Sequence, residues 1–266
     1  MRRIGHPLLG LVVAVVLLGC SAQGQRPMLY QTSTLDALME GVYDGDVTLG
    51  ELKRHGDIGL GTFAALDGEM VVLDGVVYQV RLDGKVYRPD DRQITPFAVA
   101  AFQQRGQPLH LTDGNGIAAL ERQLDALLAA DRNIPVLVRI DGVFEYVKTR
   151  SVPRQNPPYA RLADVAKKQA TFEFRQVKGT IVALRCPAFM QGANLVGWHM
   201  HFLTADRAAG GHMLDCRLQQ GDAVISRLDG VVVSLPRGPF RQYKPLSRPS
   251  SELDQIEKAS LMSTGR

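Results

Sequence analysis

The stretch that decides how this chain is built is residues 197–202, which reads GWHMHF. Successive side chains of a β-strand point to opposite faces, so this alternation predicts a strand with His199 and His201 on one face and apolar side chains on the other. A turn-rich connection of residues 204–211 follows, and His212 begins the next β-rich run. A hairpin across this connection would bring His212 beside the other two histidines.

Three of the six histidines in the chain fall within the 14 positions from 199 to 212. A single histidine on an apolar face is usually a core residue, but a pair at i and i+2 with a third across a hairpin is seldom accidental. Three neutral imidazoles at about 2.0–2.1 Å, with positions left open for water or substrate, form a catalytic zinc site. We therefore predict one divalent ion, zinc (Zn2+), bound by His199, His201 and His212.

A His-x-His pair also occurs in cupins and carbonic anhydrases, so the pair alone does not identify the enzyme class. A cupin places a glutamate a few residues after the pair, where this chain reads FLTAD at residues 202–206. That departure weighs against a cupin. A cupin-like oxygenase or isomerase with iron at the same histidines is the alternative metal chemistry.

Composition and charge exclude several other classes of protein. The 266 residues are 45% hydrophobic and 22% charged, which is ordinary for a soluble globular protein with a substantial core. The formal net charge is +4 without any block of like charges, so no nucleic-acid partner is expected. The chain also lacks the glycine-rich fingerprints of dinucleotide and phosphate sites.

The N-terminal residues 1–19 are typical of a lipoprotein signal peptide. Two arginines near the start precede an apolar run, residues 7–18, that is too short for a comfortable membrane span. The run ends in LLGC, which resembles a bacterial lipobox, so Cys20 is the expected lipidation site and residues 20–27 a tether. We expect an exported bacterial lipoprotein that meets the membrane through this lipid only. A plain signal peptide or an uncleaved anchor is the alternative.

The rest of the pattern predicts an α/β fold with two domains, mixed and antiparallel β-sheets and a few helices. Three Asp-Gly turn signals separate β-rich runs between residues 59 and 88, which indicates an antiparallel meander. Apolar residues at helical spacing predict a helix over residues 115–131. Shorter helices are expected at residues 34–39, near Thr48 and at residues 162–169.

Further glycines are interpreted as turns between short strands. The runs 134–140 and 143–149 flank Asp141-Gly142, which predicts one more hairpin. Four later runs are taken as separate strands at residues 171–177, 179–184, 211–218 and 223–236. A boundary near residue 165 would divide an N-terminal α/β domain (28–165) from a C-terminal β-rich metal-binding domain (166–247).

Cys186 and Cys216 could form a disulfide or remain buried thiols, and the sequence leaves both possibilities open.

Several separated segments resemble bacterial acetolactate decarboxylase. They are GLGTF (59–63), LDGEM (66–70), TPF (95–97), VKTRSVP (147–153), GWHMHF (197–202) and GGHMLD (210–215). The resemblance runs from about Leu29 to Lys258, nearly all of the mature chain. It implies a two-domain α/β protein with zinc held by the three histidines. Because members are often dimers, a homodimer is one expectation.

The resemblance also implies roles for residues outside the histidine cluster. Glu69 and a glutamate of the C-terminal tail (248–266) would reach the metal site, so part of the tail would return to it. Glu257 is the best match for the tail residue and Glu252 the second. Arg150 matches the arginine that faces the substrate carboxylate, and Thr62 matches a residue near the bound substrate.

The implied reaction is the decarboxylation of 2-acetolactate (2-hydroxy-2-methyl-3-oxobutanoate) to acetoin and CO2. Zinc would act as a Lewis acid on the ketone and hydroxyl oxygens. A glutamate would then protonate the enediolate, with Glu257 the first choice and Glu69 the second. Arg150 would orient the carboxylate without gripping it strongly, because tight binding would oppose its loss.

Two other interpretations compete with this lyase. The chain could be a lipid-anchored metal-binding or small-ligand protein that lost the reaction, although the presence of Glu69 and Arg150 weighs against that. It could also be the cupin-like iron enzyme. The sequence leaves open whether another 2-hydroxy-3-oxo acid, such as the ethyl homologue, is the substrate, and why an exported form would exist.

Overall fold

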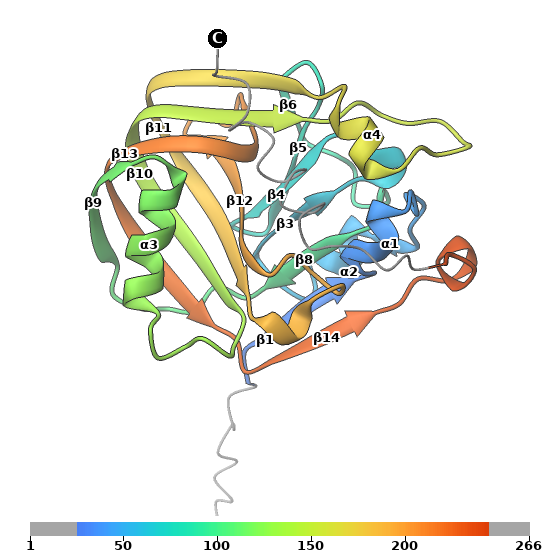
Figure 1. Ribbon diagram of the computed structural model, residues 1–266, viewed down its shortest axis with the longest axis horizontal. Helices are drawn as coiled ribbons and strands as arrows, with labels where there is room; N and C mark the ends of the chain where they lie inside the picture. Colours follow the sequence, from blue (N-terminus) through green and yellow to red (C-terminus); the bar gives the residue numbers. More distant parts are fainter. Residues whose placement is uncertain (1–25, 245–266) are drawn as a thin grey trace, which may run out of the picture.

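Two β-sheets packed against each other form the framework of the protein, and the computed structural model describes residues 26–244 (Figure 1). The expected signal peptide, Cys20, Glu252 and Glu257 lie outside the described residues. Within them, no helix has the length and apolar character needed to cross a membrane.

The first sheet has seven strands and is mixed, because β1 runs parallel to β14 and the other neighbours are antiparallel. In spatial order the strands are β14 (Gly230–Ser234), β1 (Met28–Thr32), β8 (Ala98–Ala101), β3 (Ile58–Thr62), β4 (Glu69–Leu73), β5 (Val76–Val80) and β6 (Val86–Tyr87). The expected meander is confirmed, since β3 to β6 are neighbours in sequence order. Its turns use Gly68, Gly75 and Gly84 at positive φ, which glycine adopts without steric cost.

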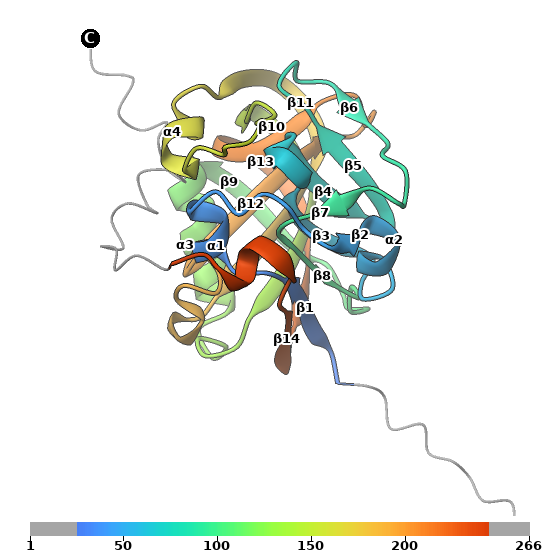
Figure 2. The ribbon, with the colours of Figure 1, turned by 90° about the vertical axis from the view of Figure 1, so that its right-hand side faces the viewer.

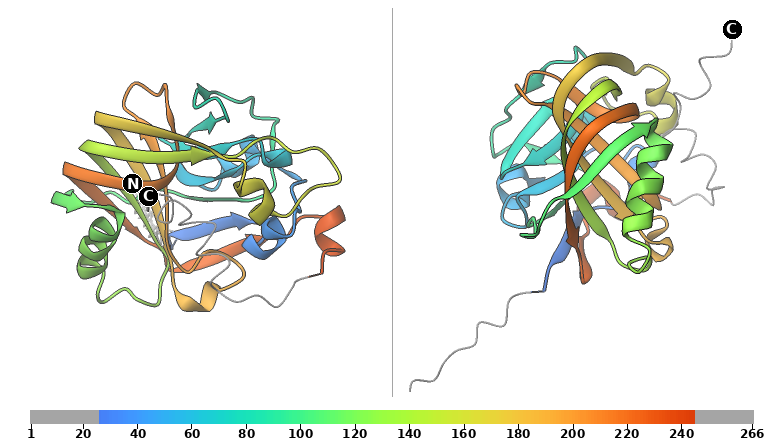
Figure 3. Two further views of the ribbon diagram at one scale, coloured as in Figure 1. Left: turned by 45° about the horizontal axis from the view of Figure 1, so that its top comes forward. Right: turned by 90° about the vertical axis from the view of Figure 1, so that its left-hand side faces the viewer.

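The second sheet has five antiparallel strands. In spatial order they are β10 (Val136–Ser151), β11 (Ala170–Cys186), β12 (Gly197–Thr204), β13 (Gly210–Arg227) and β9 (Leu109–Asn115). β10 also pairs with β13, so β10 to β13 close on themselves, and the long strands curve strongly (Figure 3). A separate two-stranded pair joins β2 (Val47–Thr48) and β7 (Ile94–Thr95).

The predicted hairpin at Asp141-Gly142 is wrong, because β10 continues through it as one strand. The runs 171–177 and 179–184 likewise merge into the single strand β11, and the run 211–218 continues into the start of the run 223–236 as β13. The rest of that last run is the separate strand β14. Gly142 lies in register with Gly179 on one side and Gly221 on the other. A Cβ at Gly142 would lie 2.7 Å from the Gln220 carbonyl oxygen. These glycines therefore allow close approach of backbones within curved strands and do not mark turns.

Four α-helices and three 3-10 turns complete the described chain. They are α1 (Leu35–Met39), α2 (Leu49–Leu52), α3 (Ile117–Leu127), α4 (Leu162–Ala166), η1 (Ala64–Leu66), η2 (Ala188–Met190) and η3 (Gly238–Arg241). The hydroxyl of Thr34 accepts from Ala37 N and caps α1, and the hydroxyl of Thr48 accepts from Glu51 N and caps α2. The four predicted helices are confirmed. α3 lies against the second sheet, whereas α1 and α4 lie beside the first (Figures 1 and 2).

The alternation of β12 places this strand between two apolar clusters. Met200 and Phe202 pack with α3 and the interior of the second sheet, and the ring of Phe202 meets that of Phe144 edge-on at 5.4 Å. Leu203 packs in a cluster shared by both sheets, with residues such as Leu60 of β3. The histidines of β12 consequently face the first sheet. Burial of these large side chains, each worth about 1.5–3 kcal/mol, fixes that orientation.

The predicted domain boundary near residue 165 stays a prediction. The two sheets do not divide at that residue. β9 and β10 precede it but belong to the second sheet, and β14 follows it but belongs to the first. Cys186 and Cys216 are both buried and free, so they form no disulfide. Burial raises the pKa of each thiol to about 12.

Candidate metal centre

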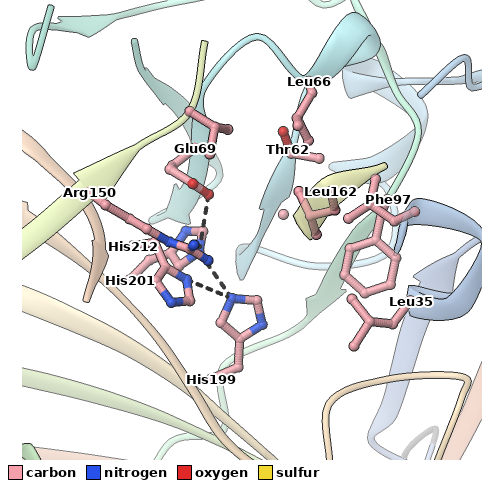
Figure 4. Close-up of a pocket in the computed structure, with 13 residues that line it drawn as sticks. Leu35, Thr62, Leu66, Glu69, Phe97, Arg150, Leu162, His199, His201 and His212 are labelled. Atoms are coloured by element: carbon pink, nitrogen blue, oxygen red, sulfur yellow. Dashed lines mark hydrogen bonds and ion pairs between the residues drawn. The ribbon is translucent and has the colours of Figure 1, made fainter. Parts of the chain in front are cut away.

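The predicted hairpin between β12 and β13 is confirmed, and it sets His201 directly opposite His212. The Nε2 atom of His199 lies 3.2 Å from Nε2 of His201 and 3.1 Å from Nδ1 of His212 (Figure 4). All three side chains are buried. Among the described residues they form the one group of metal-binding side chains close enough to share an ion.

The spacing of the three nitrogens fits a metal ion. Tetrahedral zinc with bonds of about 2.0–2.1 Å sets its ligand atoms roughly 3.3 Å apart, close to the observed separations. The Nδ1 atom of His201 lies 2.7 Å from the carbonyl oxygen of Met70. A carbonyl can only accept, so Nδ1 carries the proton and the Nε2 lone pair points into the centre. Hydrogen bonds of this kind orient metal-bound histidines.

Two glycines allow β13 to deliver His212 to this position. Gly211 has φ +134°, and a Cβ there would lie 2.4 Å from the carbonyl oxygen of Arg150. The hydroxyl of Thr149 donates to the carbonyl oxygen of Gly210 at 2.8 Å. The backbone of β13 therefore lies against β10 immediately before the histidine, in an arrangement that a larger residue would prevent.

The first sheet contributes a carboxylate and a hydroxyl. Thr62 and Glu69 lie opposite each other on β3 and β4, and both are buried. The Oε2 atom of Glu69 is 3.6 Å from Nε2 of His201. The hydroxyl of Thr62 donates to the carbonyl oxygen of Gly68 at 2.7 Å, so its remaining lone pairs can accept a hydrogen bond from a ligand.

Arg150 lies near the end of β10, in register with His212, and only 4% of it is exposed. Its Nη1 atom donates to Oε1 of Gln169, which follows α4, at 3.0 Å. The hydroxyl of the next residue, Ser151, donates to the carbonyl oxygen of Val80 and joins this strand end to the first sheet. Gln169 was not anticipated, because a single glutamine after a helical turn carries no sequence signal.

The predicted residues Thr62, Glu69, Arg150 and the three histidines line one pocket between the sheets (Figure 4). Apolar side chains form its other half, and sequence patterns did not anticipate them: Leu35, Leu38, Leu66, Phe97, Val152 and Leu162. A buried three-histidine cluster beside a carboxylate and a guanidinium, facing apolar side chains, fits a metal-binding enzyme that acts on small anionic molecules.

Comparison with known proteins agrees with this class. The chain matches the alpha-acetolactate decarboxylase family over residues 29–245. It is 42% identical over 232 residues to the alpha-acetolactate decarboxylase of Methanosarcina mazei, covering 87% of this chain and 80% of that protein. It is 41% identical over 220 residues to that of Klebsiella aerogenes, covering 83% and 84%. The alpha-acetolactate decarboxylase structure from Bacillus subtilis strain 168 superposes with a TM-score of 0.82, at 33% identity, over 87% and 98% of the two chains.

The chain belongs to the alpha-acetolactate decarboxylase family. The predicted enzyme class and the fold of mixed and antiparallel sheets with few helices are thereby confirmed.

Proposed function

We propose that this chain converts 2-acetolactate to acetoin and CO2 at a zinc ion held by His199, His201 and His212. The observation that carries the proposal is the cluster of three histidines, in which Nε2 of His199 lies 3.2 Å and 3.1 Å from the facing nitrogens of His201 and His212, in the same pocket as Glu69 and Arg150. When bound, zinc supplies a Lewis acid for the ketone and hydroxyl oxygens of the substrate. Family membership supports the choice of substrate.

The side chains around the ion would position the substrate. Arg150 carries parallel N–H donors that match a carboxylate, and its burial strengthens that contact. The hydrogen bond from Arg150 to Gln169 holds the guanidinium in place near the end of β10. The Thr62 hydroxyl can accept a hydrogen bond from the substrate hydroxyl. These contacts direct the carboxylate toward one side and leave the alkyl groups to face the apolar half.

A carboxyl group must deliver a proton to the carbon that loses CO2. Glu69 is supported by its position, because its carboxylate is buried and 3.6 Å from His201. Glu257 is the proton donor that the sequence favours, and it lies outside the described residues. Among the described residues that line the pocket, Glu69 is the one carboxylate, and it comes from the first sheet. Protonation from that side alone would give a chiral acetoin.

Metal analysis with an acetoin assay on racemic acetolactate tests the proposal. Zinc with acetoin release is the expected result. Zinc without turnover would instead support a small-ligand binding protein, and iron with oxygen uptake a cupin-like enzyme. His199→Ala is expected to lose metal and activity together. An unchanged metal content in that variant would exclude His199 as a ligand.

We also propose export and anchoring through lipid at Cys20. The support is the arginine-led apolar run that ends in LLGC. Incorporation of labelled fatty acid by the wild type and its loss in Cys20→Ala is the expected result. A Cys20→Ala protein that still partitions with membranes would contradict lipid anchoring and support an uncleaved anchor.

A further inference from the structure

The apolar half of the pocket has no part in the chemistry proposed above. Leu35, Phe97 and Leu162 lie together across the pocket from the three histidines (Figure 4). We call these three residues the apolar wall. Their exposed fractions are 3%, 2% and 5%, so they are covered by the rest of the protein as well as facing the pocket.

We propose that the apolar wall limits the length of the alkyl group on the reacting carbon, which restricts the enzyme to short 2-hydroxy-2-alkyl-3-oxo acids. The inference rests on the proposed function, because that function assigns the carboxylate, hydroxyl and ketone to the polar half. Once these groups are held there, the alkyl substituents can only face the apolar half. They then meet Leu35, Phe97 and Leu162.

The space between the two halves is small. The cavity measures about 40 Å³, so little free volume adjoins the apolar wall. One added methylene in a confined apolar pocket changes kcat/KM by about 10- to 200-fold. A longer chain could therefore bind only by moving the wall or by displacing the oxygens of the substrate from the metal centre.

The wall is held in place by the elements that carry it. Leu35 is the first residue of α1, and its N–H donates to the carbonyl oxygen of Ala193 at 2.8 Å. The carbonyl oxygen of Phe97 accepts from the N–H of Thr62 at 3.0 Å, which connects the wall to the polar half. Leu162 is the first residue of α4. All three wall residues belong to one buried cluster, so the wall resists displacement by a longer substrate.

The test compares kcat/KM for substrates whose alkyl group on the second carbon is methyl, ethyl or n-propyl. For the wild-type holoenzyme we expect a steep fall toward n-propyl. Leu162→Ala removes most of a wall side chain, so its n-propyl to methyl ratio should rise at least about 10-fold. Val165→Ala is the matched control, because Val165 is buried on the same helix and in the same cluster but is not among the described residues that line the pocket.

Binding of inert analogues separates this inference from the proposed function. The 2-hydroxy-2-methyl derivatives of propanoate, butanoate and pentanoate keep the carboxylate and hydroxyl but lack the ketone needed for decarboxylation. Calorimetry on the zinc-loaded protein should show affinity falling along this series in the wild type and recovering in Leu162→Ala. If that binding pattern is found but no acetoin is formed from acetolactate, the role of the apolar wall would stand and the proposed decarboxylation would be refuted. Equal ratios in Leu162→Ala and Val165→Ala, or no change in either, would overturn the assignment of the wall.

Discussion

Replacing Gln169 with leucine tests whether the position of Arg150 depends on its hydrogen bond to this residue. Leucine has nearly the same size but offers no acceptor for Nη1, which now donates to Oε1 at 3.0 Å. A hydrogen bond to a charged group contributes about 1.5–3 kcal/mol. If Arg150 leaves its place entirely, kcat/KM for acetolactate falls by about 10- to 150-fold. That range is an upper limit. The hydrogen bond between Gln169 and Arg150 also exists before substrate binds, so its loss affects the free enzyme as well as the complex.

The loss should appear mainly in KM. A guanidinium that orients the carboxylate contacts it in the ground state as well as in the transition state, and removal of such uniform binding raises KM more than it lowers kcat. Steady-state kinetics with acetolactate, together with metal content and thermal unfolding, measure these effects. Lys168→Leu is the matched control, because that neighbouring side chain is exposed.

A second substitution distinguishes position from charge. Gln169→Glu keeps an acceptor near Arg150 but adds a negative charge close to the substrate carboxylate. We expect it to fold at least as stably as the wild type and to have a raised KM. A kcat/KM for Gln169→Leu within about twofold of the wild type, with zinc and stability unchanged, would refute the reasoning.

Three further perturbations address the proton donor, the strand contact and the buried thiols. Glu69→Gln should keep its zinc and lose most turnover, as measured by metal analysis and acetoin release; full activity would exclude Glu69 as the acid. Gly211→Ala should destabilise the protein by roughly 1–3 kcal/mol and reduce zinc content, because its Cβ would clash with the Arg150 carbonyl; an unchanged denaturant midpoint would contradict this. Cys186 and Cys216 hold their protons to about pH 12 when folded. Stability should therefore fall above pH 9 as the unfolded thiols ionise, by about 1 kcal/mol per thiol at pH 10, and Cys216→Ala should flatten that fall.

The local features of the fold follow closely from the sequence. Strand alternation predicted which face of β12 carries the histidines, and the short connection predicted the hairpin that adds His212. The same local reasoning failed at Asp141-Gly142. A turn and a close approach between strands both require glycine, and only the register with Gly179 and Gly221 distinguishes them.

By itself, the sequence determined the three candidate ligands, because they lie within one hairpin and their geometry depends on short-range periodicity. Family resemblance pointed to Glu69 and Arg150, and the pattern around them did not. Only the tertiary structure decided their placement, since the packing of two sheets brings β4 to β12 and puts the Met70 carbonyl on His201, 131 residues away. It alone revealed Gln169 and the apolar wall. Leucine and phenylalanine pack in any core, and only the meeting of α1, α4 and the loop at Phe97 makes them face a pocket.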